Sequence, residues 1–257
     1  MASAATATVN APSSRWRAYL RLAMLIGWFC LCIIPHQVAK LAGPSRWPRR
    51  FLRGVAFIVG ADITRAGPHP GPCELLIGNH VSWLDVPVLA GATGCAFVSK
   101  AEIRDHWFLK WAADQNATLY VNRSDRRGIH QQTAAMSRAL RRAQPLAIFP
   151  EGTVGDGGTL LPFKPSLLSA VAPPPKGVTL RPVAIDYNGY ALLFVWAPGE
   201  HGLDNFLRIL GRKGRIPVTV RVLDPMTGHC DRKALARAAH DAIAQALLPS
   251  GIKPASL

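Results

Sequence analysis

The sequence predicts an α/β fold with a mixed, largely parallel sheet flanked by helices, because strand-like apolar runs alternate with helical candidates from Glu74 onward. The clearest helical candidate repeats Ile129, Thr133, Met136 and Leu140 at steps of three and four residues, opposite a face of arginines. The strand candidates are residues 75–77, 95–98, 118–121, 146–149, 178–185, 191–196 and 218–223. A chain of 257 residues can bury such a core as one domain.

Composition limits the possible partners. The chain has 30 basic and 15 acidic side chains, a formal charge of +15. Such an excess favours anionic partners, namely nucleic acid, anionic lipid or a phosphorylated substrate. Zinc-ligand spacing, an RNP-like strand and a dense basic helix are all absent from the sequence, which argues against nucleic acid. The five cysteines are scattered and odd in number, so we expect no metal site, no disulfide framework and a reducing compartment.

The beginning of the chain differs from the rest. Residues 1–14 are rich in Ala, Thr, Ser and Pro and are expected to be disordered. Arginines then precede thirteen uncharged residues, 22–34, and Pro35 is expected to end this helix. Thirteen helical residues reach about 20 Å, less than the roughly 30 Å of hydrocarbon in a bilayer. A signal peptide is an alternative, but no small-x-small cleavage site follows Pro35.

A second apolar stretch, residues 51–63, follows the turn signal Gly43-Pro44. Residues 15–63 are therefore predicted to form a helical hairpin that dips into one leaflet, with both basic ends at the same anionic surface. We expect a monotopic or single-hairpin membrane protein at the cytoplasmic face of the inner membrane; two ordinary core helices are the alternative. Residues 64–257 would then form the α/β domain, with Asp231 capping its last helix.

A histidine and an aspartate follow the first strand candidate of this domain. His80 comes directly after the apolar run 75–77, and Asp85 lies five residues further on. A histidine is suited to accept a proton near neutral pH, and a carboxylate on its other nitrogen would fix its tautomer. In one continuous helix the two side chains would lie about 140° apart. We therefore expect Asn79 and His80 in a strand-to-helix turn and Asp85 in the first turns of the helix.

Two further strand candidates end in residues suited to binding. The run 146–149 leads into Pro150-Glu151-Gly152-Thr153, in which proline ends the ladder and glycine permits close approach of a ligand. Glu151 is expected to hold a hydroxyl or an arginine. The run 118–121 leads to Arg123, whose guanidinium matches phosphate oxygens.

These motifs together resemble the 1-acylglycerol-3-phosphate acyltransferase family. The resemblance rests on four ordered blocks between about Glu74 and Ile185: Asn79-His80 with Ser82 and Asp85, Tyr120 to Arg123, Phe149 to Thr153, and Leu180 to Val183. It implies a single acyltransferase domain that moves a fatty acyl group from acyl-CoA or acyl carrier protein to a lysolipid hydroxyl. His80 would be the general base and Asp85 its partner. The implied substrate-binding residues are Asn79, Ser82, Arg123, Glu151, Gly152, Thr153, Lys164 and Pro182, with no metal and no further cofactor.

Lysophosphatidate is the acceptor that the resemblance favours. The sequence departs from the family pattern after Thr153, where Val154-Gly155-Asp156 replaces an expected arginine, and in Pro165-Ser166 after Phe163-Lys164. The Gly-Asp-Gly segment resembles family members that acylate lyso-ornithine lipid, which is the alternative acceptor. A Gly-x-Ser-x-Gly elbow is absent, which favours direct transfer over an acyl-enzyme. A basic membrane-binding protein without catalysis is the alternative from a different class.

Overall fold

The computed structural model describes residues 13–105, 107–121, 129–197, 199–227 and 231–255. Arg123 and most of the segment expected to be disordered, residues 1–14, lie outside these ranges. A seven-stranded sheet forms the centre, with the order β1-β8-β7-β2-β5-β3-β4. Within the described residues its neighbours are parallel except for the antiparallel pair β7 and β8, which confirms the predicted mixed, largely parallel sheet. The strands are β1 (Ala61–Ala66), β2 (Glu74–Gly78), β3 (Ala96–Lys100), β4 (Leu119–Val121), β5 (Leu146–Ile148), β7 (Thr179–Asp186) and β8 (Ile216–Val222).

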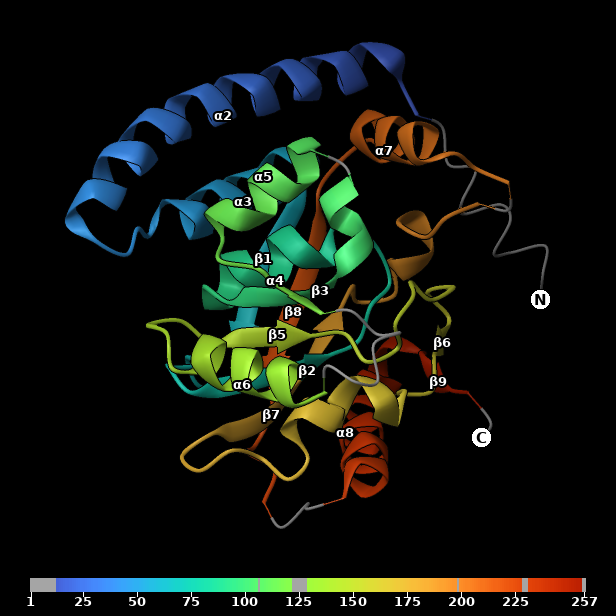
Figure 1. Ribbon diagram of the computed structural model, residues 1–257. Helices are drawn as coiled ribbons and strands as arrows, with labels where there is room; N and C mark the ends of the chain where they lie inside the picture. The colour runs from blue at the N-terminus through green and yellow to red at the C-terminus, as the bar shows by residue number, and fades with distance from the viewer. Residues whose placement is uncertain (1–12, 106, 122–128, 198, 228–230, 256–257) are drawn as a thin grey trace.

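Helices cover both faces of this sheet (Figure 1). Alternate residues of β2 point to opposite faces, so Leu76 joins one core cluster while Leu75 and Ile77 join the other. The first cluster lies under α2 (Arg15–Ala42), α3 (Trp47–Val59), α4 (Asp85–Thr93) and α7 (Gly202–Gly211). The second lies under α6 (Ile129–Leu140), α8 (Arg232–Leu247) and the 3₁₀ helix η2 (Pro165–Val171). Asp231 caps α8 as predicted, because its carboxylate accepts the backbone N–H groups of Lys233 and Ala234.

Smaller elements complete the domain. Helix α5 (Trp107–Gln115) lies against α2 through ring contacts of Phe108 and Trp111 with Phe29. Strands β6 (Thr159–Leu160) and β9 (Lys253–Pro254) pair with each other. Short 3₁₀ helices lie at Ala101–Asp105 (η1), Ala191–Leu193 (η3) and Leu248–Ser250 (η4).

One predicted strand is wrong, and one predicted boundary differs from the start of a strand. Residues 191–196 do not form a strand; the apolar run turns through η3 and buries Ala191, Phe194 and Val195. A short apolar run fits a strand or a buried turn equally well, so the pattern could not separate them. Strand β1 begins at Ala61, just before the predicted boundary at residue 64, and Ala61 pairs with Ile216 of β8.

Helix α2 is longer than expected. It continues through Pro35 and ends at Ala42, so the prediction that Pro35 ends the helix is wrong. A proline removes one backbone hydrogen bond, which bends a helix without necessarily ending it, and Figure 1 shows α2 as a curved helix over the domain. This helix is long and apolar enough to cross a membrane, and only 11% of its most apolar window is buried.

Helix α3 belongs to the core, unlike the free arm of a membrane hairpin. It lies between α2 and α4 and buries Ala56 and Val59 completely. Gly91 of α4 faces it so closely that a Cβ atom there would lie 2.9 Å from the Cα of Arg53. Residues 15–63 thus contain two helices, the second of which is docked on the α/β domain, and their association with a membrane stays a prediction.

We expect Gly91→Val to destabilise the protein by about 2 kcal/mol, because the added carbons force α3 away from α4. The loss would appear as a lower midpoint in chemical unfolding of the purified chain. The control is Gly27→Ala in α2, where nothing lies within 4 Å of the added Cβ; it should match or slightly exceed wild-type stability. Equal stability of Gly91→Val and wild type would contradict the tight packing of α3 on α4.

Candidate active site

The turn between β2 and α4 presents His80. Strand β2 ends at Gly78, where a Cβ would lie 3.2 Å from the ring of Phe149, so glycine allows the two strand ends to approach. The side chain of Asn79 then bonds both backbone groups of Ile185 on β7, at 2.7 Å to the amide nitrogen and 3.1 Å to the carbonyl oxygen. Asp85 is the first residue of α4. The expected placement of Asn79, His80 and Asp85 is therefore confirmed.

His80 and Asp85 form the predicted pair. The Nδ1 atom of His80 lies 2.9 Å from Oδ2 of Asp85. An ionised carboxylate only accepts hydrogen bonds, so Nδ1 carries the hydrogen and Nε2 presents a lone pair. The imidazole stacks on Phe149 with 4.4 Å between ring centroids and 8° between planes. About 20% of the His80 side chain is exposed and none of that of Asp85, so the pair has one buried and one accessible end.

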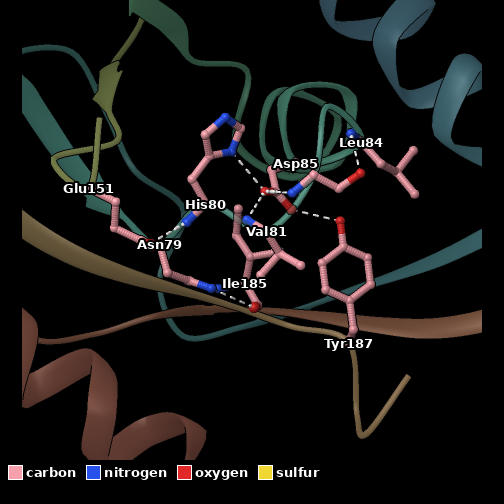
Figure 2. Close-up of polar contacts among 9 residues, drawn as sticks. Asn79, His80, Val81, Leu84, Asp85, Glu151, Ile185 and Tyr187 are labelled. Carbon is pink, nitrogen blue, oxygen red and sulfur yellow. Dashed lines mark hydrogen bonds and ion pairs between the residues drawn. The ribbon is translucent and has the colours of Figure 1, made fainter. Parts of the chain in front are cut away.

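Four donors surround the Asp85 carboxylate (Figure 2). Its Oδ2 atom accepts the backbone N–H groups of Val81 at 2.6 Å and Ser82 at 2.8 Å, in addition to His80. Its Oδ1 atom accepts the hydroxyl of Tyr187 at 2.6 Å. Burial, and then the charge of Asp85, raises the pKa of Tyr187 well above its usual value, so this hydroxyl keeps its proton and donates. Hydrogen bonds of this number are what a fully buried carboxylate requires.

Glu151 supports the same loop from the other side. Its Oε1 atom accepts the backbone N–H of His80 at 2.6 Å, and the residue is only 2% exposed. Burial raises the pKa of Glu151 to about 8, with the His80 hydrogen bond opposing the rise and the nearby charge of Asp85 supporting it. In this structure Glu151 therefore holds the backbone of His80, and the expectation that it also holds a hydroxyl or an arginine stays a prediction.

The segment after Thr153 closes one side of the site. The N–H of Gly155 donates to the carbonyl of His80 at 2.8 Å, and Asp156 accepts the N–H groups of Gly158 and Thr159 with one carboxylate oxygen. A small pocket beside His80 lies between this segment and the residues at and after the end of α8. It is lined by Asn79, His80, Val81, Glu151, Gly157, Thr159, Leu160, Leu247 and Ile252.

The other predicted substrate-binding residues separate into two groups. Gly152 and Thr153 lie on the loop beside Glu151. Lys164 is exposed, and its backbone N–H donates to the carbonyl oxygen of Pro150. Ser82 and Pro182 are buried instead: Ser82 lies in the turn below Asp85, and Pro182 pairs in register with Ile77 inside the sheet. We correct both to structural positions. Arg123 lies outside the described residues.

Sequence reasoning missed two parts of this site. Tyr187 follows β7 directly, and a tyrosine just after the strand candidate 178–185 was the available signal. The pocket wall formed by Leu247 and Ile252 had no signal in the sequence, because its position depends on the pairing of two-residue strands, β6 and β9.

Comparisons with known proteins show the family to which this chain belongs. A family model described as Acyltransferase matches residues 68–186. A lyso-ornithine lipid O-acyltransferase of Brucella abortus is 34% identical, with 92% of this chain and 95% of the relative covered. The chain belongs to the lysophospholipid acyltransferase family. This acyltransferase also aligns with the Pseudomonas aeruginosa lyso-ornithine lipid O-acyltransferase, at 34% identity over 91% of the chain and 95% of the relative.

Other relatives match a shorter region. A 1-acyl-sn-glycerol-3-phosphate acyltransferase of Neisseria meningitidis is 34% identical over 52% of the acyltransferase and 53% of that relative. The crystal structure of the 1-acyl-sn-glycerophosphate acyltransferase PlsC from Thermotoga maritima covers 90% of the chain and 92% of its own, with a TM-score of 0.65 and 17% identity, which shows the shared fold. The predicted family and enzyme class are thereby confirmed, and the non-catalytic alternative is set aside.

We expect Tyr187→Phe to lower kcat about tenfold with little change in KM, because the buried Asp85 loses one donor and holds His80 less firmly. Without the hydrogen bond from Tyr187, the Asp85 carboxylate also concentrates more negative charge near the imidazole, which makes the protonated imidazole more stable. The acid limb of the pH–rate profile should therefore move to higher pH, measured as initial acyl-transfer rates between pH 5 and 9. Exposed Tyr190→Phe, on the same turn, should change neither quantity. An unaltered pH profile for Tyr187→Phe would contradict the proposed connection.

Glu151→Gln should change how stability depends on pH. The folded-state pKa of Glu151 is raised from 4.5 to about 8, so its contribution is fully present below pH 4.5 and is lost as the pH rises through 8. The neutral amide can still accept the His80 N–H and does not ionise. We expect the thermal unfolding curves of wild type and Glu151→Gln to coincide near pH 5. Toward pH 9 the variant should become increasingly more stable than wild type. The control Glu102→Gln changes an exposed residue, so its stability should depend on pH as that of wild type does. If the stability of Glu151→Gln also followed wild type at every pH, the buried neutral carboxyl would be refuted.

Proposed function

We propose that the acyltransferase transfers a fatty acyl group from a thioester, acyl-CoA or acyl carrier protein, to the hydroxyl of lyso-ornithine lipid. The observation that carries this choice is the share of the chain that aligns with each kind of relative. Two relatives with that acceptor in their names align with 91–92% of the chain, whereas the Neisseria lysophosphatidate enzyme aligns with 52%. This preference replaces lysophosphatidate as first choice with the acceptor that the Gly155-Asp156-Gly157 segment indicated.

The geometry at His80 supports direct transfer. Nε2 would accept the proton of the acceptor hydroxyl as its oxygen attacks the thioester carbonyl, and Asp85 would stabilise the charged imidazolium. Collapse of the tetrahedral intermediate then forms the ester and releases the thiolate, which takes the proton from His80. A thiol has a parent pKa of about 8.5, so the thiolate of the donor is a good leaving group. The pKa of an alcohol is close to that of water, about 15.7, so the acceptor hydroxyl needs activation more than the leaving group does. Stacking on Phe149 keeps the ring in one orientation.

The charge of the pocket favours an acceptor without a phosphate. Among the described residues, the lining beside His80 includes no lysine or arginine. Glu151 forms part of it but is mainly neutral at neutral pH, because burial raises its pKa to about 8, and the exposed Asp156 lies on the loop that continues from it. Lyso-ornithine lipid carries one ammonium and one carboxylate, so Asp156 opposes it less than it opposes a phosphate monoester. Its ammonium would be complementary to Asp156.

Helix α2 supports attachment to a membrane. Its exposed side chains are mainly apolar along its length: Trp16, Tyr19, Leu20, Met24, Ile26, Leu31, Ile34, Val38 and Leu41. Exposed apolar area on this scale is typical of a surface that contacts a partner or lipid. We propose that α2 lies in the cytoplasmic leaflet of the inner membrane, where a lysolipid acceptor and cytosolic thioester donors are both available.

An acceptor panel tests the proposed function. Purified enzyme would receive one labelled acyl-CoA and, in turn, lyso-ornithine lipid, lysophosphatidate or a zwitterionic lysophospholipid. We expect kcat/KM to be highest for lyso-ornithine lipid, at least about tenfold above lysophosphatidate, a difference of about 1.4 kcal/mol in transition-state binding. Higher kcat/KM for lysophosphatidate would refute the acceptor and retain the acyltransferase.

His80→Ala is the control for the mechanism in the same assay. It should lower kcat by roughly 10² to 10⁴, the usual contribution of a general base. Binding to vesicles should be unchanged, because His80 lies away from α2. Wild-type activity in His80→Ala would exclude the proposed base for every acceptor.

A further inference from the structure

A second concave site lies away from His80, between α2, α3 and the start of β8. It is a groove of about 290 Å³. Its lining combines three arginines with apolar side chains: Trp16, Arg17, Leu20, Arg21, Met24, Phe57, Ile58 and Arg215. Lysolipid transfer at His80 uses none of these residues. The combination of cations and apolar walls in one groove is the chemistry of an amphiphilic anion.

The arginines hold more positive charge than their protein partners neutralise. Arg17 and Arg21 donate to backbone carbonyls at the end of α7, including Gly211 at 3.3 Å and Leu210 at 2.8 Å. Arg215 bonds Asp62, with Nε at 2.7 Å from Oδ1. Asp62 is the one carboxylate paired with this cluster among the described residues. Helix C-termini contribute only partial negative charge, so the groove keeps an excess of cation.

A fourth arginine behind the groove strengthens this imbalance. Arg212 is 93% buried, with 7% exposed, and its Nε atom has no hydrogen-bond partner among the described residues. Burial, together with the neighbouring charges of Arg21 and Arg215, lowers the pKa of Arg212 to about 10. Burial and the charges of Arg17 and Arg215 also lower the pKa of Arg21. An anion in the groove would relieve this mutual repulsion.

The apolar walls lead away from the arginines along α2. Leu20 and Met24 are 51% and 47% exposed and lie one helical turn apart on the same face. Phe57 of α3 lies opposite them, with the guanidinium of Arg215 above its ring at 4.0 Å from the centroid. An acyl chain could follow these side chains while its phosphate stayed with the guanidinium groups.

We propose that this groove binds one anionic phospholipid of the membrane, with its phosphodiester between Arg17, Arg21 and Arg215 and one acyl chain along Leu20, Met24 and Ile58. The inference extends the proposed membrane attachment and is independent of which acceptor the enzyme uses. Guanidinium groups suit this role because they form paired, charge-assisted hydrogen bonds with phosphate oxygens.

The position of the groove gives the bound lipid a consequence. Strand β8 runs antiparallel to β7, so Ile216 at its start lies at the edge of the sheet where β7 and β2 end. That edge carries His80. Asn188, just after Tyr187, bonds the carbonyl of Pro217 and so connects the two regions. A lipid held at Arg215 would keep the membrane surface at the same edge as the reacting hydroxyl.

The test uses the full chain in dodecyl maltoside micelles, titrated with dioctanoyl phosphatidylglycerol. Dioctanoyl phosphatidylcholine and inorganic phosphate at equal concentrations are the comparison ligands. We expect a saturable rise in Tm with phosphatidylglycerol and a much smaller one with either comparison ligand. An equal rise with inorganic phosphate would show an anion site without lipid recognition and would overturn the proposal.

Three variants separate a defined site from general surface charge. Arg17→Gln should weaken the apparent phosphatidylglycerol affinity about tenfold or more. Met24→Trp keeps every arginine but fills the apolar wall, and should weaken it similarly; Met24 is exposed enough to change without unfolding the chain. Exposed Arg50→Gln, at the other end of α3, removes the same charge outside the groove and should bind as wild type. Wild-type affinity in both Arg17→Gln and Met24→Trp, or equal loss in Arg50→Gln, would refute the site.

Acyl-transfer activity distinguishes this inference from the proposed function. His80→Ala should bind phosphatidylglycerol as wild type while losing catalysis. Loss of the lipid-dependent Tm shift in His80→Ala would place the lipid in the catalytic pocket and overturn the separate site.

Discussion

The structure depends on one buried carboxylate. Asp85 has no exposed side-chain area, yet it lies at the end of a loop that must present a reactive histidine. Its two oxygens accept hydrogen bonds from the turn after β2, from His80 itself and from Tyr187 after β7. Removing a donor from such a group leaves polar atoms unsatisfied, which costs more than the hydrogen bond contributes in water. The adjacency of β2 and β7 is therefore required by the site as well as by the core.

The parts of the site that the sequence revealed are those held within one short segment. His80 and Asp85 are five residues apart, so helix geometry alone restricted how they could meet, and the strand-to-helix turn followed. Tyr187 and Glu151 act on that turn from 102 and 71 residues away. Such long-range contacts depend on strand order, which alternating apolar runs do not specify. Ser82 and Pro182 were misassigned for the same reason: the pattern located them near the site without showing that their side chains point into the interior.

The same limit explains the errors in the fold. The runs that became β2, β5, β7 and β8 were recognised because their side chains alternate or are buried on both faces. Strand β1 was missed because Asp62, Thr64 and Arg65 interrupt its apolar character at an edge of the sheet. Local composition also suggested that α2 and α3 share one environment. They do not, because α3 is covered on both sides by α2 and α4, whereas α2 leaves a long apolar face exposed.

Glu151 and Asp85 lie close together, and two ionised carboxylates there would repel each other. Burial prevents this, because it keeps Glu151 mainly protonated. Glu151 and Asp85 both bond the His80 segment, but burial raises the pKa of Glu151 to about 8. At neutral pH Glu151 is then mainly protonated, so it adds little negative charge beside the carboxylate that contacts the imidazole. Glu151 can position the backbone of His80 without competing for its proton or repelling an acceptor's carboxylate. The Pro-Glu-Gly-Thr loop thus acts as a neutral support, and the electrostatic effect on the reaction comes from Asp85 through His80.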